Sequence, residues 1–288
     1  MRALALPFVL GALVLLDPPD ALRAQSPTAA RLTSPAAQRV ADSLLALMTP
    51  EEKLGQLTMF PGASGQTGPA VPPAADSAVR AGRIGSFLSI YSVRDTRRLQ
   101  QLAMQSRLKI PLLFAFDVIH GWRTVFPVPL AMAATFDSAA VAEAARIAAV
   151  EATGAGVHWT FAPMVDIARD ARWGRIVEGA GEDPFLGSIM AAAQVRGFQG
   201  EPALLGGRAA PPPTVMLATP KHFAGYGAAE GGRDYNTVEL SERTLWDVYL
   251  PPFEAAIRAG AGTIMAAFNE IGGSTTSHSV RSVSSTVL

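Results

Sequence analysis

The sequence predicts an α/β fold, an incomplete (β/α)8 barrel of the TIM type with about the first five β/α units. Three observations support this prediction. Short apolar runs alternate with helical stretches, which is typical of βαβ units and a parallel sheet. The chain has 288 residues, 49% of them hydrophobic, and one such barrel takes ~250 residues. Polar residues gather directly after the apolar runs, where barrel enzymes build their sites.

An open, doubly wound sheet is the other architecture that fits this alternation. A dinucleotide-binding sheet of that kind needs a G-x-G-x-x-G turn between its first strand and helix, and the sequence has none there. Gly154-Ala155-Gly156 precedes a strand and ends a helix instead. The barrel is therefore favoured. Five strands cannot close a barrel of eight, so we expect two open sheet edges and poor solubility, or the need for a partner fragment.

The first residues are typical of a secretory signal peptide. Arg2 precedes the apolar run 3–16, and a short polar stretch leads to a cleavage point after Ala24. The run is shorter than the ~20 residues of a membrane span, although a retained anchor is the alternative. We expect residues 1–24 to be removed, the mature protein to be periplasmic or secreted, and no other segment to cross a membrane.

Residues 25–75 are expected to form N-terminal helices and a loop. The first helix is predicted at about Ala37–Met48. Thr49 then caps a second helix, with Pro50 in its first turn and Glu52 completing a capping box. This helix is expected to continue through Met59. Residues 61–75 are rich in Gly and Pro, which indicates the loop.

Residues 76–273 form the predicted barrel portion. Its five strands are expected at 84–90, 112–116, 157–161, 215–218 and 263–268. Its main helices are expected at 138–153, 184–197 and 241–259. The first of these is rich in Ala and has apolar positions at helical spacing.

Composition excludes several classes of function. The formal net charge is +0, so no basic excess points to nucleic acid. The chain has no cysteine, which excludes disulfides, thiolate nucleophiles and Cys-ligated zinc. The four His are widely separated, without zinc-like spacing, so we expect neither a metal nor another cofactor. The oligomeric state stays open.

Three polar groups follow predicted strands. Asp117 comes directly after residues 112–116, where its carboxylate either accepts adjacent sugar hydroxyls or caps the next helix. Residues 172–178 form a loop dense in opposite charges, in which an Arg fork binds hydroxyls or joins solvated ion pairs. Lys221-His222 ends the fourth strand before a Gly-rich loop, and its two donors favour a site.

Together these segments resemble glycoside hydrolase family 3 over about Ala41–Gly273. The opening 44–57 takes part in this resemblance. The other motifs are PLLFAFDVIHG (111–121), RWGRIVEGAGEDP (172–184), KHFAGYGAAEGGRDYN (221–236) and IMAAFNEIGG (264–273). Their order and spacing carry the resemblance more than any one of them alone.

The resemblance implies a barrel that binds a terminal β-linked sugar, usually glucose. The implied substrate-binding residues are Asp117, Arg175, Lys221, His222, Asp234 and Phe268. Asp117 is implied to accept hydrogen bonds from sugar hydroxyls. The donors to the same ring are implied to be Arg175, Lys221 and His222. Asp234 is implied to lie near the next subsite, and Phe268 beside the ring. The Ala-Gly-Tyr-Gly loop at 224–227 favours β-glucosidases or β-xylosidases over β-N-acetylhexosaminidases, which carry a His-Asp pair there.

The family mechanism is retaining: one carboxylate attacks the anomeric carbon and a second carboxyl group protonates the leaving oxygen. In relatives the nucleophile is an Asp that ends the next strand, and the acid/base usually comes from a following domain. Beyond Asp247 this chain has no Asp, and its only acidic residues are Glu254 and Glu270. No catalytic residue is therefore assigned, and we expect the isolated chain to be inactive. Residues 274–288 diverge from the family, as a frameshift or a truncated gene model would produce.

The leading hypothesis is the substrate-binding part of a β-glucosidase that acts on β-glucosides and oligosaccharides, with β-xylosides as the alternative substrate. A sugar-binding pseudoenzyme that keeps the implied residues is a second hypothesis. A non-functional gene fragment is the third.

Overall fold

The computed structural model describes residues 35–62, 74–200 and 213–275. The predicted signal peptide (1–24), most of the predicted loop at 61–75 and nearly all of the predicted tail (274–288) lie outside the described residues. Within the described ranges, no helix is both long enough and apolar enough to span a bilayer.

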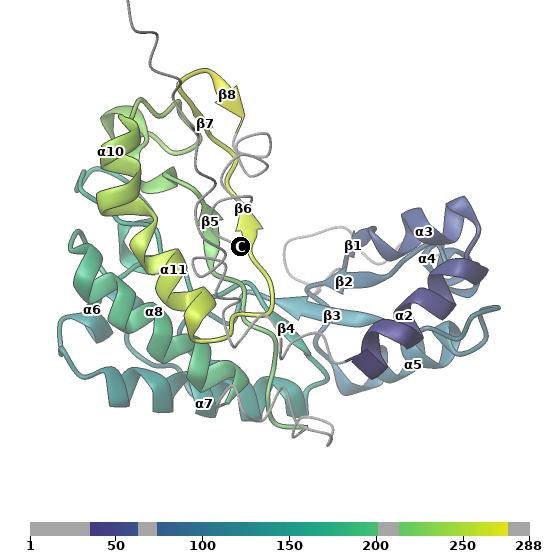
Figure 1. Ribbon diagram of the computed structural model, residues 1–288. Helices are drawn as coiled ribbons and strands as arrows, with labels where there is room; N and C mark the ends of the chain where they lie inside the picture. Colours follow the sequence, from purple (N-terminus) through teal and green to yellow (C-terminus); the bar gives the residue numbers. More distant parts are fainter. Residues whose placement is uncertain (1–34, 63–73, 201–212, 276–288) are drawn as a thin grey trace, which may run out of the picture.

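Parallel strands form a row that follows the order of the chain (Figure 1). The first sheet consists of β1 (Met59–Pro61), β2 (Ser86–Leu88), β3 (Leu113–Phe116) and β4 (Trp159–Thr160). Isolated parallel bridges from Trp159 to Leu217 and from Met164 to Lys221 lead on from β4. They reach β5 (Lys221–Phe223), which pairs in parallel with β6 (Met265–Ala266). Each strand lies beside the next along the chain, as in a barrel.

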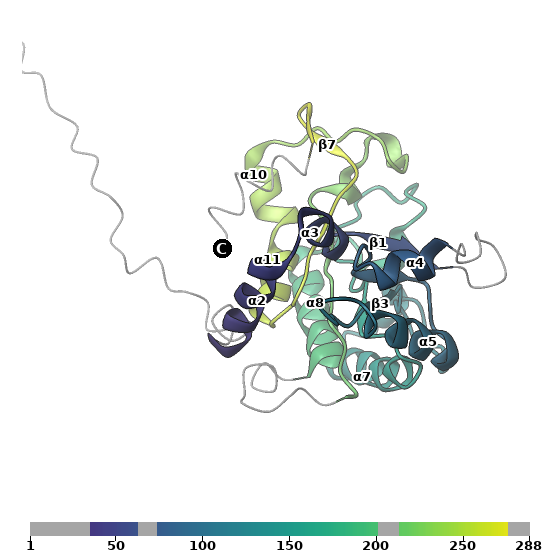
Figure 2. The same cartoon turned by 90° about the vertical axis from the view of Figure 1, so that its right-hand side faces the viewer.

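Helices alternate with these strands. The N-terminal ones are α2 (Pro35–Leu47), α3 (Pro50–Gln56), α4 (Ala74–Arg80) and α5 (Val93–Ala103). After β3 come α6 (Pro129–Ala133), α7 (Ser138–Gly154), the 3-10 turn η2 (Ile176–Glu178) and α8 (Pro184–Gln199). After β5 come the 3-10 turns η3 (Tyr226–Ala228) and η4 (Glu230–Gly232). A hairpin of β7 (Glu270–Ile271) and β8 (Ser274–Thr275) follows β6. Figures 1 and 2 show α4 and α5 beside β1–β3.

The predicted helices at 37–48, 138–153 and 184–197 are confirmed by α2, α7 and α8. The predicted capping box is also confirmed. Thr49 Oγ1 accepts from the Glu52 N–H at 3.2 Å, and Glu52 Oε2 accepts from the Thr49 N–H at 2.9 Å. Arg107 donates to the same carboxylate, with its Nε 3.1 Å from Glu52 Oε1, and so ties α3 to the segment after α5.

β1 was not predicted, because the second helix was expected to continue through Met59. That helix, α3, ends at Gln56. A Cβ on Gly55 would meet the Gly82 carbonyl oxygen at 2.2 Å, so the helix ends in close contact with the turn before β2. A strand of three residues is too short for an apolar pattern to reveal, and its pairing with β2 defines it. Within the described ranges the row therefore has four strands in the first sheet and two in the second, six where five were expected.

Two later predictions also need correction. The strand predicted at 215–218 contributes only the bridge at Leu217, and the paired strand β5 begins at Lys221. The helix predicted at 241–259 is broken into α10 (Glu242–Thr244), the π-helical η5 (Leu245–Tyr249) and α11 (Pro251–Arg258). Pro251 and Pro252 have no N–H to donate, so they begin a helix rather than continue one.

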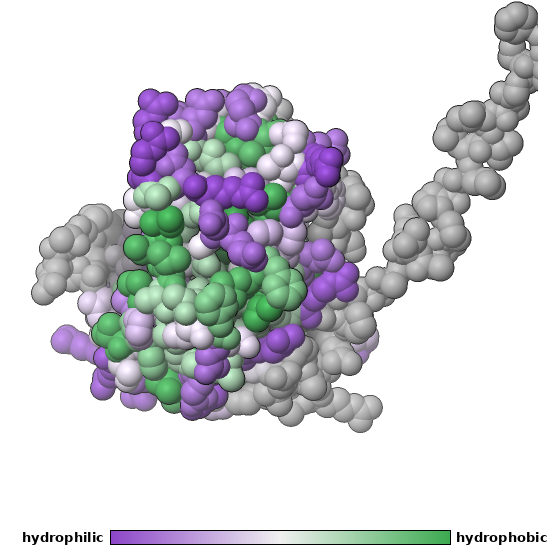
Figure 3. All heavy atoms as spheres, turned by 90° about the vertical axis from the view of Figure 1, so that its left-hand side faces the viewer, coloured by the Kyte–Doolittle hydropathy of each residue, from purple (hydrophilic) through white to green (hydrophobic). Residues whose placement is uncertain are grey.

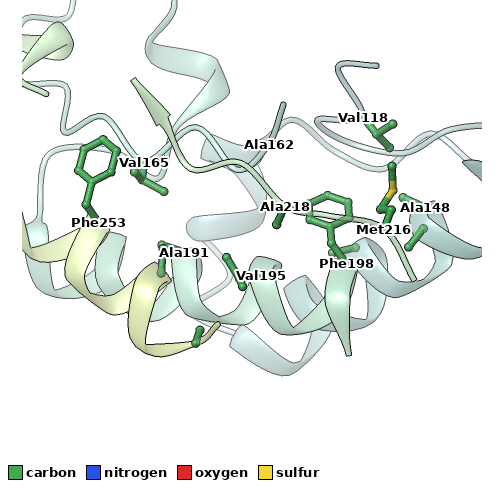
Figure 4. Packing of buried hydrophobic residues seen from close by; sticks show 14 of the residues in the cluster. Val118, Ala148, Ala162, Val165, Ala191, Val195, Phe198, Met216, Ala218 and Phe253 are labelled. Carbon is green, nitrogen blue, oxygen red and sulfur yellow. The ribbon is translucent and has the colours of Figure 1, made fainter. Parts of the chain in front are cut away.

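The main core lies between the strands and the helices α7, α8 and α11. Small side chains let α7 and α8 approach closely: a Cβ on Gly197 would meet the Ala142 carbonyl oxygen at 2.3 Å. Figure 4 shows the packed side chains, with Phe198 beside Ala218 and Phe253 rising from α11. A second cluster, which includes Phe87 and Phe114, packs β2 and β3 against α5.

One face of the molecule carries an apolar region below a more polar one (Figure 3). At the start of α8, Phe185 is 75% exposed and Ile189 is 39% exposed. Both line a groove that α7, α8 and α11 form together. Exposed apolar surface promotes association, and the poor solubility expected from the sequence stays a prediction.

Phe253→Ala should lower the free energy of unfolding by about 3–5 kcal/mol, because truncating a buried ring leaves a cavity. Phe253 is 2% exposed, whereas the matched control Phe185 is 75% exposed. Phe185→Ala should change stability by about 0.5 kcal/mol or less. Urea denaturation followed by circular dichroism measures both variants. Equal losses in the two would contradict the packing of α11 onto the core.

Candidate functional site

Four of the six predicted site residues meet where neighbouring strands end. Asp117 directly follows β3, and Lys221 and His222 lie in β5. Lys221 Nζ donates to Asp117 Oδ1 at 2.7 Å. The Lys221 side chain is 3% exposed and that of Asp117 is 45% exposed. This pair therefore places a buried ammonium group beneath a carboxylate that faces solvent.

Arg175 reaches the same place from the loop between β4 and α8. Its Nη1 lies 3.3 Å from His222 Nε2. Its Nε and Nη2 donate to the two oxygens of Glu178 at 2.8 and 2.9 Å. This bidentate geometry fixes the plane of the guanidinium. The Arg175 Cζ also lies 5.6 Å from the centre of the Tyr226 ring, within the range of a cation–π contact.

The ion pair between Arg175 and Glu178 shifts the pKa of both groups. Burial alone would raise the pKa of Glu178, but the Arg175 guanidinium holds it below its ordinary value, with smaller contributions from Lys221 and His222. The hydrogen bonds that Arg175 donates to Glu178 in turn raise the pKa of Arg175. Both side chains therefore carry their charges at neutral pH.

His222 is held on its other side by Asp166. Asp166 Oδ2 accepts from the His222 backbone N–H at 3.0 Å and lies 2.8 Å from His222 Nδ1. Both side chains are almost completely buried. Asp166 stands just past the isolated bridge between Met164 and Lys221, so the pairing of the two chain segments brings it to β5.

Asp234 joins this group of side chains through aromatic residues. Trp173 Nε1 donates to Asp234 Oδ1 at 2.9 Å, and the Trp173 and Tyr226 rings pack edge to face at 5.4 Å. The Tyr226 ring also lies 4.8 Å from the His222 ring. Burial alone would raise the pKa of Asp234, but the neighbouring Tyr226 hydroxyl and Trp173 indole lower it below its ordinary value. Asp234 is therefore an anion at the edge of the site.

Phe268 lies further out, just after β6. Its side chain is 69% exposed and that of Tyr235 is 66% exposed. Their ring centres are 5.5 Å apart, and the Phe268 ring lies 6.5 Å from that of Tyr226. All six predicted residues thus belong to one connected neighbourhood, which Phe268 joins through its ring contacts with Tyr226 and Tyr235. In the part of the chain that the structure describes, no group of three or more His, Asp or Glu side chains is arranged to hold a metal ion.

Asp166 and Tyr226 were not predicted as members of this neighbourhood, and Glu178 and Trp173 had no predicted site role. A single Asp inside the apolar segment Met164-Val165-Asp166-Ile167-Ala168 was the available signal for Asp166. Such a carboxylate is costly to bury without a partner. The partner lies 56 residues away in the sequence, so the pairing could not be read from local pattern.

Glu178→Gln should lower the free energy of unfolding by about 1–3 kcal/mol at neutral pH, because Arg175 loses its charged bidentate partner. The pKa of Glu178 is lowered from 4.5 in the folded state. A lowered carboxyl pKa adds stability that is present above the unfolded pKa and is lost as the pH falls toward the folded value. The difference between wild type and Glu178→Gln should therefore hold above about pH 4.5 and shrink below it.

Chemical denaturation at a series of pH values measures this difference. Glu254→Gln is the control, because Glu254 forms its ion pair with Arg258 on an exposed face of α11. A Glu178→Gln penalty that grows as the pH falls would contradict the lowered pKa.

Residues 49–288 match the family model described as the glycosyl hydrolase family 3 N terminal domain. A periplasmic β-glucosidase of Salmonella typhimurium is 43% identical over 244 residues, which cover 84% of this chain and 30% of that protein. A β-xylosidase of Formosa agariphila is 36% identical over 185 residues, 60% of this chain and 25% of that protein. The chain thus spans about a third of the length of these relatives, or less.

A solved structure of a β-glucosidase from Listeria innocua in complex with glucose superposes with a TM-score of 0.75 at 41% identity. It covers 83% of this chain, and this chain covers 34% of it. An exo-1,3/1,4-β-glucanase from Pseudoalteromonas gives the same TM-score at 28% identity, with 86% of this chain covered. The predicted fold class is confirmed, and the row of parallel strands is the first part of a TIM-type barrel. The chain belongs to glycosyl hydrolase family 3 and carries the N-terminal domain of that family.

Proposed function

We propose that this chain binds the terminal glucose ring of β-glucosides, as the ring-binding part of a retaining β-glucosidase. The observation that carries the proposal is the convergence of Asp117, Lys221 and the Arg175–His222 pair at the mouth of β3–β5. A half-exposed carboxylate next to fixed cationic donors suits a ring with several adjacent hydroxyls. The resemblance assigns the same four positions to the sugar, independently of these contacts.

The catalytic carboxylates are proposed to come from outside this chain. Both acidic residues beyond Asp247 already have partners. Glu254 accepts from Arg258 at 2.7 Å, and Glu270 Oε1 accepts from the Thr237 hydroxyl at 3.0 Å. A retaining glycosidase needs a nucleophile and an acid/base about 5–5.5 Å apart across the bond that breaks. The site thus supplies recognition of the ring, and we propose that the 288-residue chain alone does not turn over.

The proposal extends to the location and to a second substrate class. Residues 1–24 have the composition of a signal peptide, and one relative is named a periplasmic enzyme, so we propose a periplasmic or secreted protein. Two relatives from Formosa agariphila are named β-xylosidases, one of them only putatively. They favour β-xylosides as the alternative substrate.

Lys221→Met should weaken binding of D-glucose by about tenfold or more, because the ring loses a charged donor worth roughly 1.5–3 kcal/mol. Met keeps the apolar stem that packs in β5. The matched control is Arg243→Met, which removes a cation from an exposed pair between Arg243 of α10 and Asp247 of η5, whose side chains are 89% and 62% exposed. Isothermal titration calorimetry with D-glucose and D-xylose compares the three proteins. Equal affinity for glucose in wild type and Lys221→Met would refute the assignment.

Hydrolysis of aryl β-glucoside and aryl β-xyloside should be absent in the chain without residues 1–24. Loss of a covalent nucleophile lowers the rate by several orders of magnitude. The same assay on the polypeptide extended through the downstream reading frame should show turnover. Activity in the short chain would overturn the proposed absence of a nucleophile, and Glu270→Gln would then test whether Glu270 takes that role.

A further inference from the structure

Asp166 is a buried carboxylate whose hydrogen bonds all go to one residue. Its side chain is 1% exposed. Oδ2 accepts from the His222 backbone N–H at 3.0 Å and faces His222 Nδ1 at 2.8 Å, and Oδ1 has no hydrogen-bond partner within the described residues. Burying such a group is costly unless a specific interaction compensates. The interaction with His222 therefore compensates the cost of burying this carboxylate.

The other ring nitrogen of His222 shows where the imidazole proton lies. Nε2 is 3.3 Å from Arg175 Nη1. A guanidinium keeps its proton and can only donate, so Nε2 has to present its lone pair. The ring proton then lies on Nδ1, where the Asp166 carboxylate accepts it. Both neighbours of the ring thus select the same tautomer.

We infer that Asp166 is a positioning residue, which holds His222 in the Nδ1-protonated tautomer and thereby aims the Arg175 guanidinium at the sugar. This inference rests on the proposed function of the site. Arg175 is held on two sides. Its Nε and Nη2 donate to Glu178, and its Nη1 contacts His222 Nε2. Among the described residues, the hydrogen bonds of Asp166 go to His222 and not to Arg175, so its effect passes through the imidazole.

This tautomer changes the role of His222. The resemblance implies an N–H that donates to the ring. With the proton on Nδ1, the nitrogen that faces Arg175 and the site is an acceptor. His222 then takes a hydrogen bond from Arg175 or from a sugar hydroxyl, and the donors to the sugar are Arg175 and Lys221.

The test is nuclear magnetic resonance of the chain with ¹⁵N-labelled histidine, read through the long-range couplings that separate the two ring nitrogens. The chain has only four histidines, and His222→Gln assigns the signal of interest. At neutral pH the wild type should show His222 with Nδ1 protonated and Nε2 unprotonated. Asp166→Ala should replace this pattern by a mixture of tautomers, and it should weaken binding of D-glucose about five- to tenfold.

Two further variants separate positioning from general stability. Asp166→Asn keeps a carbonyl oxygen for both hydrogen bonds, so it should retain the single tautomer and most of the affinity for glucose. Gln199→Ala truncates an equally buried polar side chain, which accepts from the Ala218 N–H at 2.8 Å and donates to the Gly260 carbonyl oxygen at 2.6 Å. It should lower stability and leave the His222 signal unchanged.

An imidazolium, or a proton on Nε2 alone, in the wild type would overturn the inference even if Asp166→Ala does not fold. A folded Asp166→Ala variant with the wild-type tautomer and affinity would overturn it too. The proposed function can fail independently of this inference. If the His222 tautomers behave as expected but the wild type does not bind D-glucose, the role of Asp166 in selecting the tautomer is supported and the assignment of the site to a sugar is wrong.

Discussion

The structure of the site depends on the burial of two ionisable side chains, Lys221 and His222, within one strand. Each is about 2% exposed, and a buried charge or polar ring requires a partner in place. Neither partner comes from β5. Asp117 is supplied by the end of β3 and Asp166 by the segment after β4. The parallel order of β3, β4 and β5 is therefore a condition for the site, and a slip of one residue would leave both groups without partners.

The loop after β5 has to follow the chain segment that carries Asp166, and glycine makes this possible. A Cβ on Gly227 would meet the Ile167 carbonyl oxygen at 2.2 Å, and Gly225 has φ of +76°. This close approach lets Tyr226 pack fully buried between the Trp173 and His222 rings. The aromatic ring then links the anion Asp234 to the guanidinium side of the site. The glycines are thus needed for the geometry of the charged groups.

The sequence predicted those parts of the fold and site that depend on local pattern. The capping box at Thr49 and the helix boundaries of α7 and α8 follow from neighbouring residues. Lys221 and His222 were expected directly after a strand at 215–218, whereas they lie within β5 itself. The sequence could not predict β1, which pairing alone defines, or Asp166, whose partner is distant in sequence. It also did not anticipate the break before Pro251, because the apolar spacing of 241–259 continues across it. For β1 and Asp166 the deciding contact is distant in sequence. At Pro251 the missing backbone N–H interrupts the helix although the apolar periodicity continues.

The polar groups of the site hold each other in place through hydrogen bonds and ion pairs. Lys221 gives one of its three N–H groups to Asp117, and Asp117 accepts through Oδ1 on a side chain that is 45% exposed. Under the proposed function, a sugar uses the other N–H groups and the second oxygen without breaking the pair. The side chains are ordered by these contacts, which lowers the conformational entropy that such binding would cost. This ordering of the site side chains does not involve the late carboxylates Glu254 and Glu270, which are paired with Arg258 and Thr237.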